Sequence, residues 1–340
     1  MKITINDIAK AANVSKSTVS KVINDSPTIS DETKKRVHNI MKEMNYIPNP
    51  YATQLAKQNS KTVGLFVNAS HQNHFQDPFF YSIIGGVEST LMPDNYEINV
   101  ANINSIKDAD DFFRKYVYNR KYCGLILPID SLNDTFITKL KASSVPFIII
   151  GASEELKDSP SVDINNKAAG ETVTLHLLDQ GNRHIAYLGR SSQTNPLSRS
   201  RIEGYKTAFT KYNLSLDDRL ISEKAIDDQW AHKEVIRIYQ ENPLLDSVVC
   251  EDNYLAYGAL KALKEMKLRV PQDIAVVTFN NYPLAPYLTP PMTCVHMDTF
   301  ELGRQVGQSL LEKIKKPDID IQTHLIRPQL IIRESSIRSK

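Results

Sequence analysis

The fold is decided by the stretch Asn13-Val14-Ser15-Lys16-Ser17-Thr18-Val19-Ser20-Lys21-Val22-Ile23-Asn24. Ser15 belongs to the residue types that cap the start of a helix, and apolar residues recur behind it at helical spacing. That apolar stripe consists of Val19, Val22 and Ile23. Small or basic side chains lie outside it, among them Lys16, Ser17 and Lys21. The stretch therefore predicts a short helix with one buried side and one basic, hydrogen-bonding side.

A second short helix is predicted immediately before it. Thr4-Ile5-Asn6-Asp7 has the spacing of a capping box, and the apolar face that follows consists of Ile5, Ile8, Ala9 and Ala12. Asn13 would occupy the tight turn between the helices, in the left-handed backbone conformation that Asn tolerates. Two helices joined in this way form a helix-turn-helix, whose second helix enters the DNA major groove. From this pattern alone, a helical hairpin that merely packs on a larger body is an equal alternative.

Positive charge is concentrated at the N-terminal end of the chain. Residues 1–60 contain nine Lys and Arg against five Asp and Glu, a net charge of +4, whereas the whole chain carries +2. Residues 61–340 therefore carry −2. A basic surplus suits contacts with DNA phosphates, because counterion release supplies much of their affinity. A mild surplus also occurs on ordinary solvated surfaces, so the charge supports the DNA-binding interpretation without establishing it.

Length and composition set the number of domains and the class of protein. The chain of 340 residues exceeds a typical domain of about 150, so two or three compact units are expected. Apolar residues make up 41% and charged residues 24%, values that are ordinary for globular proteins. No run of ~18 apolar residues and no signal-peptide core is present, so we expect a cytoplasmic protein without membrane contact. Cys123, Cys250 and Cys294 lack metal-binding spacing and are expected to be buried reduced thiols, and no metal or cofactor is predicted.

A third helix is predicted after the first two. Together the three helices form an N-terminal domain, which we call the head, and a linker follows it. Ser30 is a helix cap, and apolar residues recur on one face behind it. The prolines of Tyr46-Ile47-Pro48-Asn49-Pro50 prevent simple continuation of that helix. The next segment, residues 51–57, is helix-capable but too short to be stable alone. We therefore place the three-helix domain at residues 1–46 and a linker with a helix-capable segment at residues 47–60, which the resemblance described below identifies as a hinge helix.

From Thr62 onward, apolar strands alternate with longer amphipathic helices. Strands are predicted in two sets, the first at Val63–Asn68, Ile98–Ile103, Gly124–Ile129 and Phe147–Gly151, and the second at Ile185–Gly189, Ser247–Glu251 and Ile274–Phe279. Helices are predicted at Phe79–Leu91, Asp108–Asn119, Lys167–Gln180, Arg201–Tyr212, Trp230–Glu241 and Tyr254–Met266. Strand-helix alternation implies parallel sheets covered on both faces, so the two sets predict two α/β lobes. Ligands of such sheets bind beyond the carboxyl ends of the strands, which places a ligand cleft between the lobes.

The head closely resembles the N-terminal signature of the lactose-repressor (LacI/GalR) family of bacterial transcription regulators. The resemblance runs from Ile3 to Asn24, with one departure at Asn13, where the family usually has Gly. It continues through the body in Arg201-Ile202-Glu203-Gly204-Tyr205, Val270-Pro271-Gln272-Asp273-Ile274-Ala275-Val276, Phe279-Asn280-Asn281, Pro290-Pro291-Met292-Thr293 and residues 298–303. It covers nearly the whole chain and implies an all-α helix-turn-helix head and an α/β, two-lobed core like that of periplasmic binding proteins.

The resemblance also implies how the core, residues 61–340, is divided. The N-lobe would comprise about 61–160 and 291–323, and the C-lobe about 161–290 and 324–340. The chain would cross between them near residues 160, 290 and 325. Residues 298–303 would lie in a helix that helps to join two subunits. The chain stops soon after Ile331-Ile332-Arg333-Glu334 without a leucine heptad, so a homodimer is expected.

The same resemblance implies which residues touch DNA. Lys16 and Ser17 would reach base edges, and Leu55 of the hinge helix would wedge into the minor groove and kink the duplex. Contacts nearer the phosphates are expected from Thr4, Ser15, Thr18, Ser20 and Lys21. The further DNA-binding candidates are Asn24, Tyr46 and Asn49. A plain linker with one incidental leucine is the weaker alternative for the hinge, since the family pattern extends over the whole segment.

An effector site is implied at the cleft. Arg201 matches an arginine that grips ligand hydroxyls or carboxylates across the family, a task suited to the planar donors of a guanidinium. Asp252 matches a polar residue at a C-lobe strand end, and Asn280 stands where the family more often has Asp. Trp230 aligns with an aromatic residue that stacks on sugar rings, and a buried core tryptophan is an equal alternative. The N-lobe candidates are Phe79, Tyr81 and Asp130.

The segment Phe75-Gln76-Asp77-Pro78-Phe79-Phe80-Tyr81, together with Thr278-Phe279-Asn280-Asn281, resembles the maltose-operon repressor branch of the family. It implies a repressor that binds double-stranded operator DNA and is controlled by a small carbohydrate, maltose or a related glucoside. A regulator with a phosphoprotein corepressor or a different small-molecule effector is the alternative. An enzyme is not expected, because phosphate loops, nucleophile elbows and zinc spacings are missing from the sequence. A transport-binding protein would share the two lobes but would have no use for residues 1–57.

Overall fold

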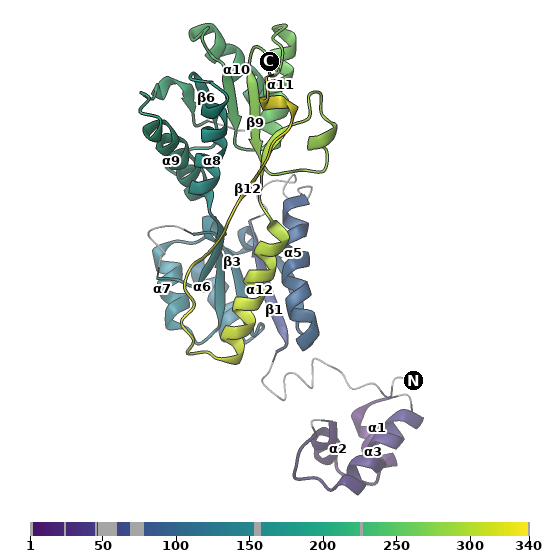
Figure 1. Ribbon diagram of the computed structural model, residues 1–340. Helices are drawn as coiled ribbons and strands as arrows, with labels where there is room; N and C mark the ends of the chain where they lie inside the picture. Colours follow the sequence, from purple (N-terminus) through teal and green to yellow (C-terminus); the bar gives the residue numbers. More distant parts are fainter. Residues whose placement is uncertain are drawn as a thin grey trace. The chain divides into compact units, whose positions relative to one another are not determined.

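The computed structural model describes residues 3–23, 25–44, 46, 60–68, 78–152, 158–224 and 227–338 (Figure 1). The chain divides into two compact units. The smaller unit comprises Met1–Val63 and Lys107–Cys123, and the larger comprises Gly64–Ile106 and Gly124–Lys340. The predicted border between head and linker is not tested, because residues 47–59 lie outside the described ranges. No helix within those ranges is long and apolar enough to cross a bilayer.

Three helices build the head in the smaller unit: α1 (Ile5–Ala11), α2 (Lys16–Ile23) and α3 (Asp31–Glu43). Their buried core consists of Ile8, Ala9, Ala12, Val19, Val22, Val37 and Met41. The partly buried residues that pack against it include Ile23, Ile40 and Met44. The apolar faces predicted from the sequence are therefore confirmed, and each helix turns one face inward.

Local hydrogen bonds fix where the head helices begin. The Asp7 carboxylate accepts from the Thr4 N–H at 2.8 Å and from the Thr4 hydroxyl at 2.7 Å. Ser15 Oγ accepts from the Thr18 N–H at 3.1 Å, which satisfies one of the unpaired donors in the first turn of α2. Asn13 has a φ of +50°, so the left-handed turn predicted between α1 and α2 is confirmed.

The second part of the smaller unit departs from its prediction. The helix expected at Asp108–Asn119 is instead α6 (Ala109–Phe112) followed by a π-helical turn, η4 (Phe113–Tyr118). The rings of Tyr116 and Tyr122 stack at a centroid distance of 5.6 Å, and this contact joins the turn to the residues that follow it. Tyr116 and Tyr122 are not separated by a helical spacing, so the periodicity of apolar residues in the sequence does not reveal this π-helical geometry.

Two six-stranded sheets occur in the part of the chain that the structure describes, in the orders β11-β5-β4-β3-β1-β2 and β12-β10-β9-β8-β6-β7. The first sheet, that of the N-lobe, contains β1 (Thr62–Val67), β2 (Glu97–Asn102), β3 (Gly124–Pro128), β4 (Phe147–Ile150), β5 (Ser161–Ile164) and β11 (His324–Ile326). The second sheet, that of the C-lobe, contains β6 (Ile185–Leu188), β7 (Ile221–Ser222), β8 (Ser247–Cys250), β9 (Ala275–Phe279), β10 (Thr293–His296) and β12 (Gln329–Ile331). The strands β6, β8 and β9 are buried along their whole length, as expected for sheets covered on both faces.

Strand pairing confirms the predicted parallel sheets. In the C-lobe, Val249 of β8 pairs in parallel with Tyr187 of β6 and with Val277 of β9. In the N-lobe, Leu127 of β3 pairs in parallel with Ile149 of β4. β12 runs antiparallel to β10 at one edge of the C-lobe sheet. The α/β lobes therefore have their carboxyl strand ends gathered on one side, where ligand sites of parallel sheets are found.

The chain crosses between the lobes three times, each time a few residues later than predicted. β5 belongs to the N-lobe sheet, although the prediction places residues from 161 onward in the C-lobe. β10 belongs to the C-lobe sheet, although the prediction places residues from 291 in the N-lobe. β11 belongs to the N-lobe sheet, although the prediction places residues from 324 in the C-lobe. These strands have only three or four residues, so they carry little sequence signal, and pairing with a neighbour decides their lobe.

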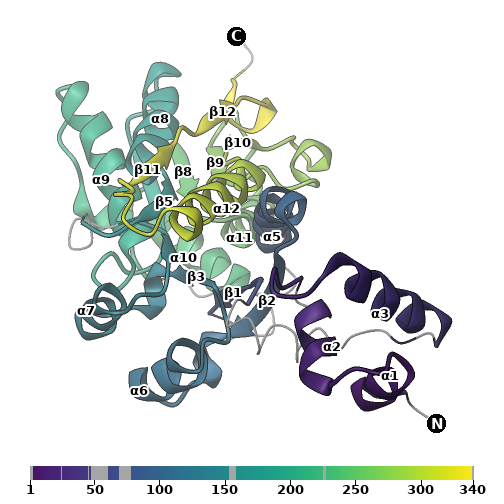
Figure 2. The same cartoon turned by 90° about the horizontal axis from the view of Figure 1, so that it is seen from below.

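Helices cover the sheets in closely packed pairs. The pairs are α5 (Pro78–Leu91) with α12 (Thr299–Lys315), α8 (Asn166–Asp179) with α9 (Pro196–Lys211), and α10 (Asp228–Glu241) with α11 (Asn253–Glu265). Figures 1 and 2 both show α5 and α12 side by side. A Cβ atom on Gly86 of α5 would lie 2.1 Å from the carbonyl oxygen of Phe300 in α12. On Gly204 of α9 it would lie 2.0 Å from the carbonyl oxygen of Lys167 in α8, so glycine is what lets these helix backbones approach.

Two further helices differ from the sequence prediction. α7 (Asp134–Ala142), capped by Asn133, was not predicted. α9 begins at Pro196, five residues before the predicted start, because Asn195 Oδ1 accepts from the Ser198 N–H at 3.2 Å. The earlier start places Arg201 in the second turn of α9 rather than at its beginning, which directs its side chain into the C-lobe.

Candidate functional site

The second helix of the head presents a hydroxyl-rich, basic surface. Lys16, Ser17 and Lys21 are exposed, on the sides of α2 that face away from the buried stripe. Ser15 Oγ is hydrogen-bonded to Ser17 Oγ at 2.7 Å and to Thr18 Oγ1 at 2.8 Å. Such hydroxyls donate and accept, so they suit both base edges and phosphate oxygens.

The other DNA-binding candidates divide into three groups. Thr4 is exposed at the start of α1, and Thr18 and Ser20 are half-buried on α2. Tyr46 packs against the core of the head, which gives it a structural role there. Asn24, Asn49 and Leu55 lie outside the described residues, so their assignments stay predictions.

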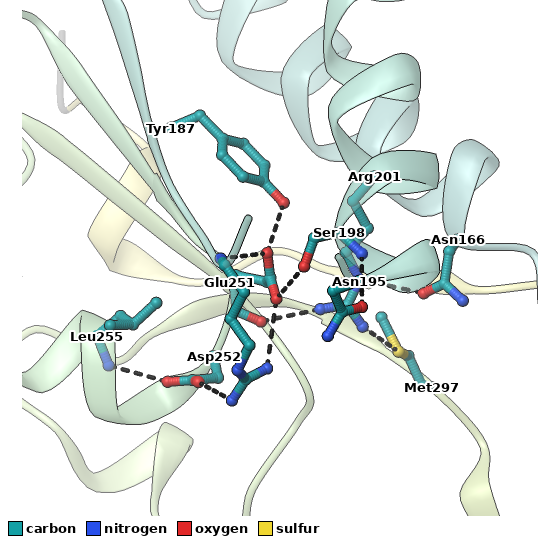
Figure 3. A network of polar contacts seen from close by, with 10 residues as sticks. Asn166, Tyr187, Asn195, Ser198, Arg201, Glu251, Asp252, Leu255 and Met297 are labelled. Atoms are coloured by element: carbon teal, nitrogen blue, oxygen red, sulfur yellow. Dashed lines mark hydrogen bonds and ion pairs between the residues drawn. The ribbon is translucent and has the colours of Figure 1, made fainter. Parts of the chain in front are cut away.

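A network of polar contacts lies at the carboxyl ends of the C-lobe strands β6 and β8, and its centre is Glu251 (Figure 3). The side chain of Glu251 is 0% exposed. Its carboxylate accepts from the Ser198 hydroxyl at 2.8 Å and from the Tyr187 hydroxyl at 3.3 Å. It also accepts from the Arg190 N–H at 3.1 Å and from Arg190 Nη1 at 3.3 Å. Burying a carboxylate away from solvent is costly unless hydrogen-bond donors surround it, and here four donors are supplied.

Gly189 makes room for this carboxylate. A Cβ atom on Gly189 would lie 2.4 Å from Glu251 Oε2 and 2.5 Å from Tyr187 Cε1. Only a residue without a side chain leaves the carboxylate its place between the ends of β6 and β8. The position of Glu251 thus depends on the glycine that ends the predicted strand Ile185–Gly189.

Arg201 is built into the same network from α9. It is 97% buried, and its guanidinium lies 4.3 Å from the ring centroid of Phe279. Its Nε donates to Asn166 Oδ1 at 3.1 Å, and its Nη1 donates to the main-chain oxygen of Glu251 at 2.9 Å. Nη2 reaches Met297 Sδ at 3.3 Å, a weak acceptor. The guanidinium is therefore held rigidly, with its weakest hydrogen bond on Nη2.

Asp252 joins the network on its outer side. One carboxylate oxygen accepts from the Leu255 N–H at 3.0 Å and so caps α11. The other pairs with Arg190 Nη2 at 3.1 Å. Because the Arg190 side chain is 51% exposed, it is the part of the network that solvent or a ligand reaches most easily.

Asn280 follows β9 and has an unusual environment. Its φ is +69°, a left-handed conformation that Asn adopts more readily than most residues. Its Oδ1 is buried and has no hydrogen-bond partner among the described residues, and an orphaned buried acceptor is costly. It lines a hollow of about 180 Å³ together with Ser82, Asn281, Tyr282, Pro283, His296, Met297 and Thr299. The hollow therefore offers a ligand hydroxyl an acceptor that the protein leaves unused.

The N-lobe candidates lie at separate places. Asp130, just after β3, accepts from Asn68 Nδ2 at 3.2 Å, and Asn68 Oδ1 accepts from Asn104 Nδ2 at 2.6 Å. These residues follow the carboxyl ends of β1, β2 and β3. Tyr81 is 58% exposed on α5. Phe79 also lies on α5, but its side chain is outside the described part of the chain.

Trp230 is placed less favourably for stacking on a sugar. It is half-buried on α10 and packs against the apolar core cluster of the C-lobe. Of the two interpretations that the sequence left open, this packing favours the core tryptophan. Arg201 and Asp252 are joined through Glu251, and Met297 links Arg201 to the hollow beside Asn280.

The polar residues of these sites that sequence reasoning missed include Arg190, Glu251, Asn68 and Asn104. A signal was present for all four, since Asn68 and Glu251 directly follow β1 and β8, and Arg190 and Asn104 lie two residues beyond the ends of β6 and β2. Residues at carboxyl strand ends are where parallel sheets place ligand contacts. Their pairing across strands, however, has no counterpart in sequence spacing.

Asp163, in β5 beside the first crossing, has a perturbed acidity. Its carboxylate accepts from the Ala152 N–H at 3.0 Å and from the Ile164 N–H at 2.7 Å. Burial raises the pKa of Asp163 to about 6, even though these hydrogen bonds and the charge of Arg201 act in the opposite direction.

Comparisons with known proteins agree with this architecture. Residues 4–49 match the family described as bacterial regulatory proteins, lacI family, and residues 174–336 match the periplasmic binding protein-like domain. The HTH-type transcriptional regulator MalR of Streptococcus pneumoniae is 31% identical over 320 residues, which cover 92% of this chain and 93% of the relative. The HTH-type transcriptional repressor PurR of Aliivibrio fischeri is 28% identical over 98% of each chain.

A solved structure extends the comparison to three dimensions. The transcriptional regulator CelR-cellobiose complex matches 98% of this chain and 99% of its own, with a TM-score of 0.72 and 26% identity. This structural likeness extends over nearly the whole of both chains. This chain belongs to the lacI family of bacterial regulatory proteins.

Proposed function

We propose that this protein is a sequence-specific repressor of transcription whose affinity for operator DNA is set by a small uncharged sugar. The observation that carries the proposal is the pairing of an exposed basic helix in the head with an orphaned polar acceptor in the core. The basic helix suits contacts with DNA, and the acceptor in the core suits a hydrogen bond from a ligand hydroxyl. We name maltose or a related glucoside as the effector.

DNA binding is supported by the head. The side chains of α2 that face away from its core are Lys16, Ser17 and Lys21, which are types that contact base edges and phosphates. We assign base contacts to Lys16 and Ser17 and a minor-groove wedge to Leu55, as the family resemblance implies. Two heads of a homodimer would read the two halves of a pseudo-palindromic operator.

An uncharged effector is supported by the balance of charge in the C-lobe network. Arg190 pairs with the carboxylates of Glu251 and Asp252, and Arg201 donates to the main-chain oxygen of Glu251. A phosphorylated or carboxylated ligand would have to displace these pairs, whereas a hydroxyl can accept from a guanidinium and donate to Asn280 Oδ1. The resemblance to the maltose-operon branch and the cellobiose named for the CelR relative point to a sugar of this kind.

Control of DNA binding would follow from differential affinity. A sugar that binds one arrangement of the lobes more tightly shifts the protein toward that arrangement. In the arrangement with bound sugar, we propose, the N-lobes separate, the hinge helices melt and Leu55 leaves the minor groove. The operator is then released and the downstream gene is transcribed.

Thermal unfolding of the full-length protein against a panel of mono- and disaccharides tests the effector assignment. A ligand at 100 times its Kd stabilises by about 2.7 kcal/mol, which corresponds to a Tm increase of roughly 5–10 °C. We expect the increase with maltose, its loss in Asn280→Ala, and its retention in Trp230→Phe. An increase that survives Asn280→Ala and disappears in Trp230→Phe would place the sugar at α10 and contradict our assignment.

A gel-shift titration with palindromic DNA tests the direction of control. Maltose should weaken DNA binding if the protein is an induced repressor. The alternative, a regulator with a phosphoprotein corepressor, predicts stronger binding when the phosphoprotein is added and no response to maltose. Failure to bind palindromic DNA at low ionic strength, with and without sugar, would exclude both.

A further inference from the structure

A cluster of cations lies where the core is joined to the segment that leads to the head. We call Lys61, Arg120 and Lys121 the basic turn, and all three are exposed. Residues 112–123 contain Arg114, Lys115, Arg120 and Lys121 but no Asp or Glu. Within this segment, Arg114 and Lys115 pair with Asp111 at 2.6 and 3.3 Å, so they are left out of the basic turn.

Two hydrogen bonds hold the segment around Lys61 beside the segment around Lys121. Ser60 Oγ donates to the Lys121 carbonyl oxygen at 2.9 Å, and the Cys123 N–H donates to the Thr62 carbonyl oxygen at 2.9 Å. Residues 60–62 therefore run beside residues 121–123, which brings Lys61 close to the other two cations. The charge of Lys61 also acts on the Cys123 thiol, which agrees with this proximity.

Aromatic rings hold one of these cations in place. Lys121 Nζ lies 5.2 Å from the centroid of the Tyr116 ring and 5.1 Å from that of the Tyr122 ring. The two rings stack at an angle of 12°. Cation–π contacts of this kind attract the ammonium group and restrict its side chain, so less entropy is lost when it meets an anion. Tyr118, 70% exposed, adds a polar aromatic surface to the same segment.

The position of the basic turn in the chain indicates its partner. Ser60 is the last residue of the predicted hinge and linker, residues 47–60, so the chain on its N-terminal side leads to the helix-turn-helix head. We propose that the basic turn is a second DNA-contacting surface, which binds phosphates next to the site read by the heads. This inference rests on the DNA binding proposed above. A polyanion fits because phosphates are recognised by charge without base sequence.

The salt dependence of DNA binding tests this surface, and a random duplex suffices because the contacts are to phosphates. In full-length protein we compare wild type with the triple variant Lys61→Gln, Arg120→Gln, Lys121→Gln by fluorescence anisotropy between 50 and 200 mM salt. Each lost phosphate contact reduces the slope of log K against log salt by about 0.9. Loss of two contacts would make the affinity of the variant fall roughly tenfold less than that of wild type over this range.

Two matched variants control for net charge and for folding. Lys233→Gln, Lys261→Gln, Lys264→Gln removes the same charge from exposed positions of α10 and α11, and it should keep the wild-type slope. Lys61→Arg, Arg120→Lys, Lys121→Arg keeps the charge of the basic turn and should also keep the slope. Equal slopes for the Gln variant of the basic turn and its α10–α11 control overturn the inference. Absence of DNA binding by wild type would instead contradict the proposed function.

Discussion

Glu251→Gln is the perturbation that most directly tests the C-lobe network. The substitution preserves shape but replaces one carboxylate oxygen with an amide NH₂ group. Each oxygen of Glu251 accepts from two donors, Ser198 Oγ and Arg190 Nη1 on one, Tyr187 Oη and the Arg190 N–H on the other. Whichever way the amide turns, two donors then face a third donor in a site without solvent.

The cost follows from these contacts. A hydrogen bond to a charged group contributes about 1.5–3 kcal/mol, and a buried donor left unsatisfied costs about 1–3 kcal/mol. The Tyr187 hydroxyl can rotate and accept from the amide, and Arg190 is half-exposed and can turn to water, so both losses are reduced. We therefore expect a loss of about 3 kcal/mol, at the lower end of the range for breaking a buried ion pair.

The single tryptophan provides a lobe-specific assay. Trp230 lies on α10 and packs on the C-lobe core, so its fluorescence follows the unfolding of that lobe. For a unit of this size, 3 kcal/mol corresponds to a fall in Tm of roughly 6–12 °C. Urea titration of the same signal gives the free energy without assuming that both lobes unfold together.

A surface carboxylate provides the comparison. Glu203 pairs with Lys167 at 3.8 Å, and both side chains are more than half exposed, so Glu203→Gln should change stability by no more than about 0.5 kcal/mol. If Glu251→Gln unfolds within the same margin of wild type as Glu203→Gln, the carboxylate does not anchor the strand ends and our reading of the network is wrong.

Three further predictions concern packing, acidity and the hinge. Gly86→Ala should destabilise by about 1–3 kcal/mol in thermal unfolding, because the new Cβ would lie 2.1 Å from the Phe300 carbonyl oxygen, whereas Gly85→Ala, whose nearest neighbour is 3.7 Å away, should be neutral or stabilising. Since the pKa of Asp163 is raised to about 6 in the folded protein, its stabilising contribution is complete below pH 4 and is lost as pH rises through 6; urea titrations between pH 4 and 7 should show this loss in wild type but not in Asp163→Asn. Leu55→Ala should weaken operator binding in a gel-shift titration while the affinity for effector stays the same, and unchanged operator affinity would count against the wedge.

The sequence by itself determined the head, because its signals are local. The Thr4–Asp7 contact, the Ser15 cap and the left-handed Asn13 each involve residues within three or four positions of one another. The long buried strands were also predictable, since an apolar run bounded by turns is sufficient to indicate them. The family could be named from motifs, and its α/β core followed from strand-helix alternation.

The tertiary structure decided what depends on residues far apart in the chain. The short strands β5, β10 and β11 acquire their lobe from the neighbour they pair with, and so the crossings come later than predicted. Glu251 meets Arg190 only because β6 and β8 are adjacent, and the sequence does not specify this arrangement for two residues that are 61 positions apart. Asn280 was chosen from a motif, but only the folded chain shows that its oxygen is buried without a described partner. Local sequence preferences determine where helices and strands form. Pairing and burial between distant segments determine which side chains meet in a functional site.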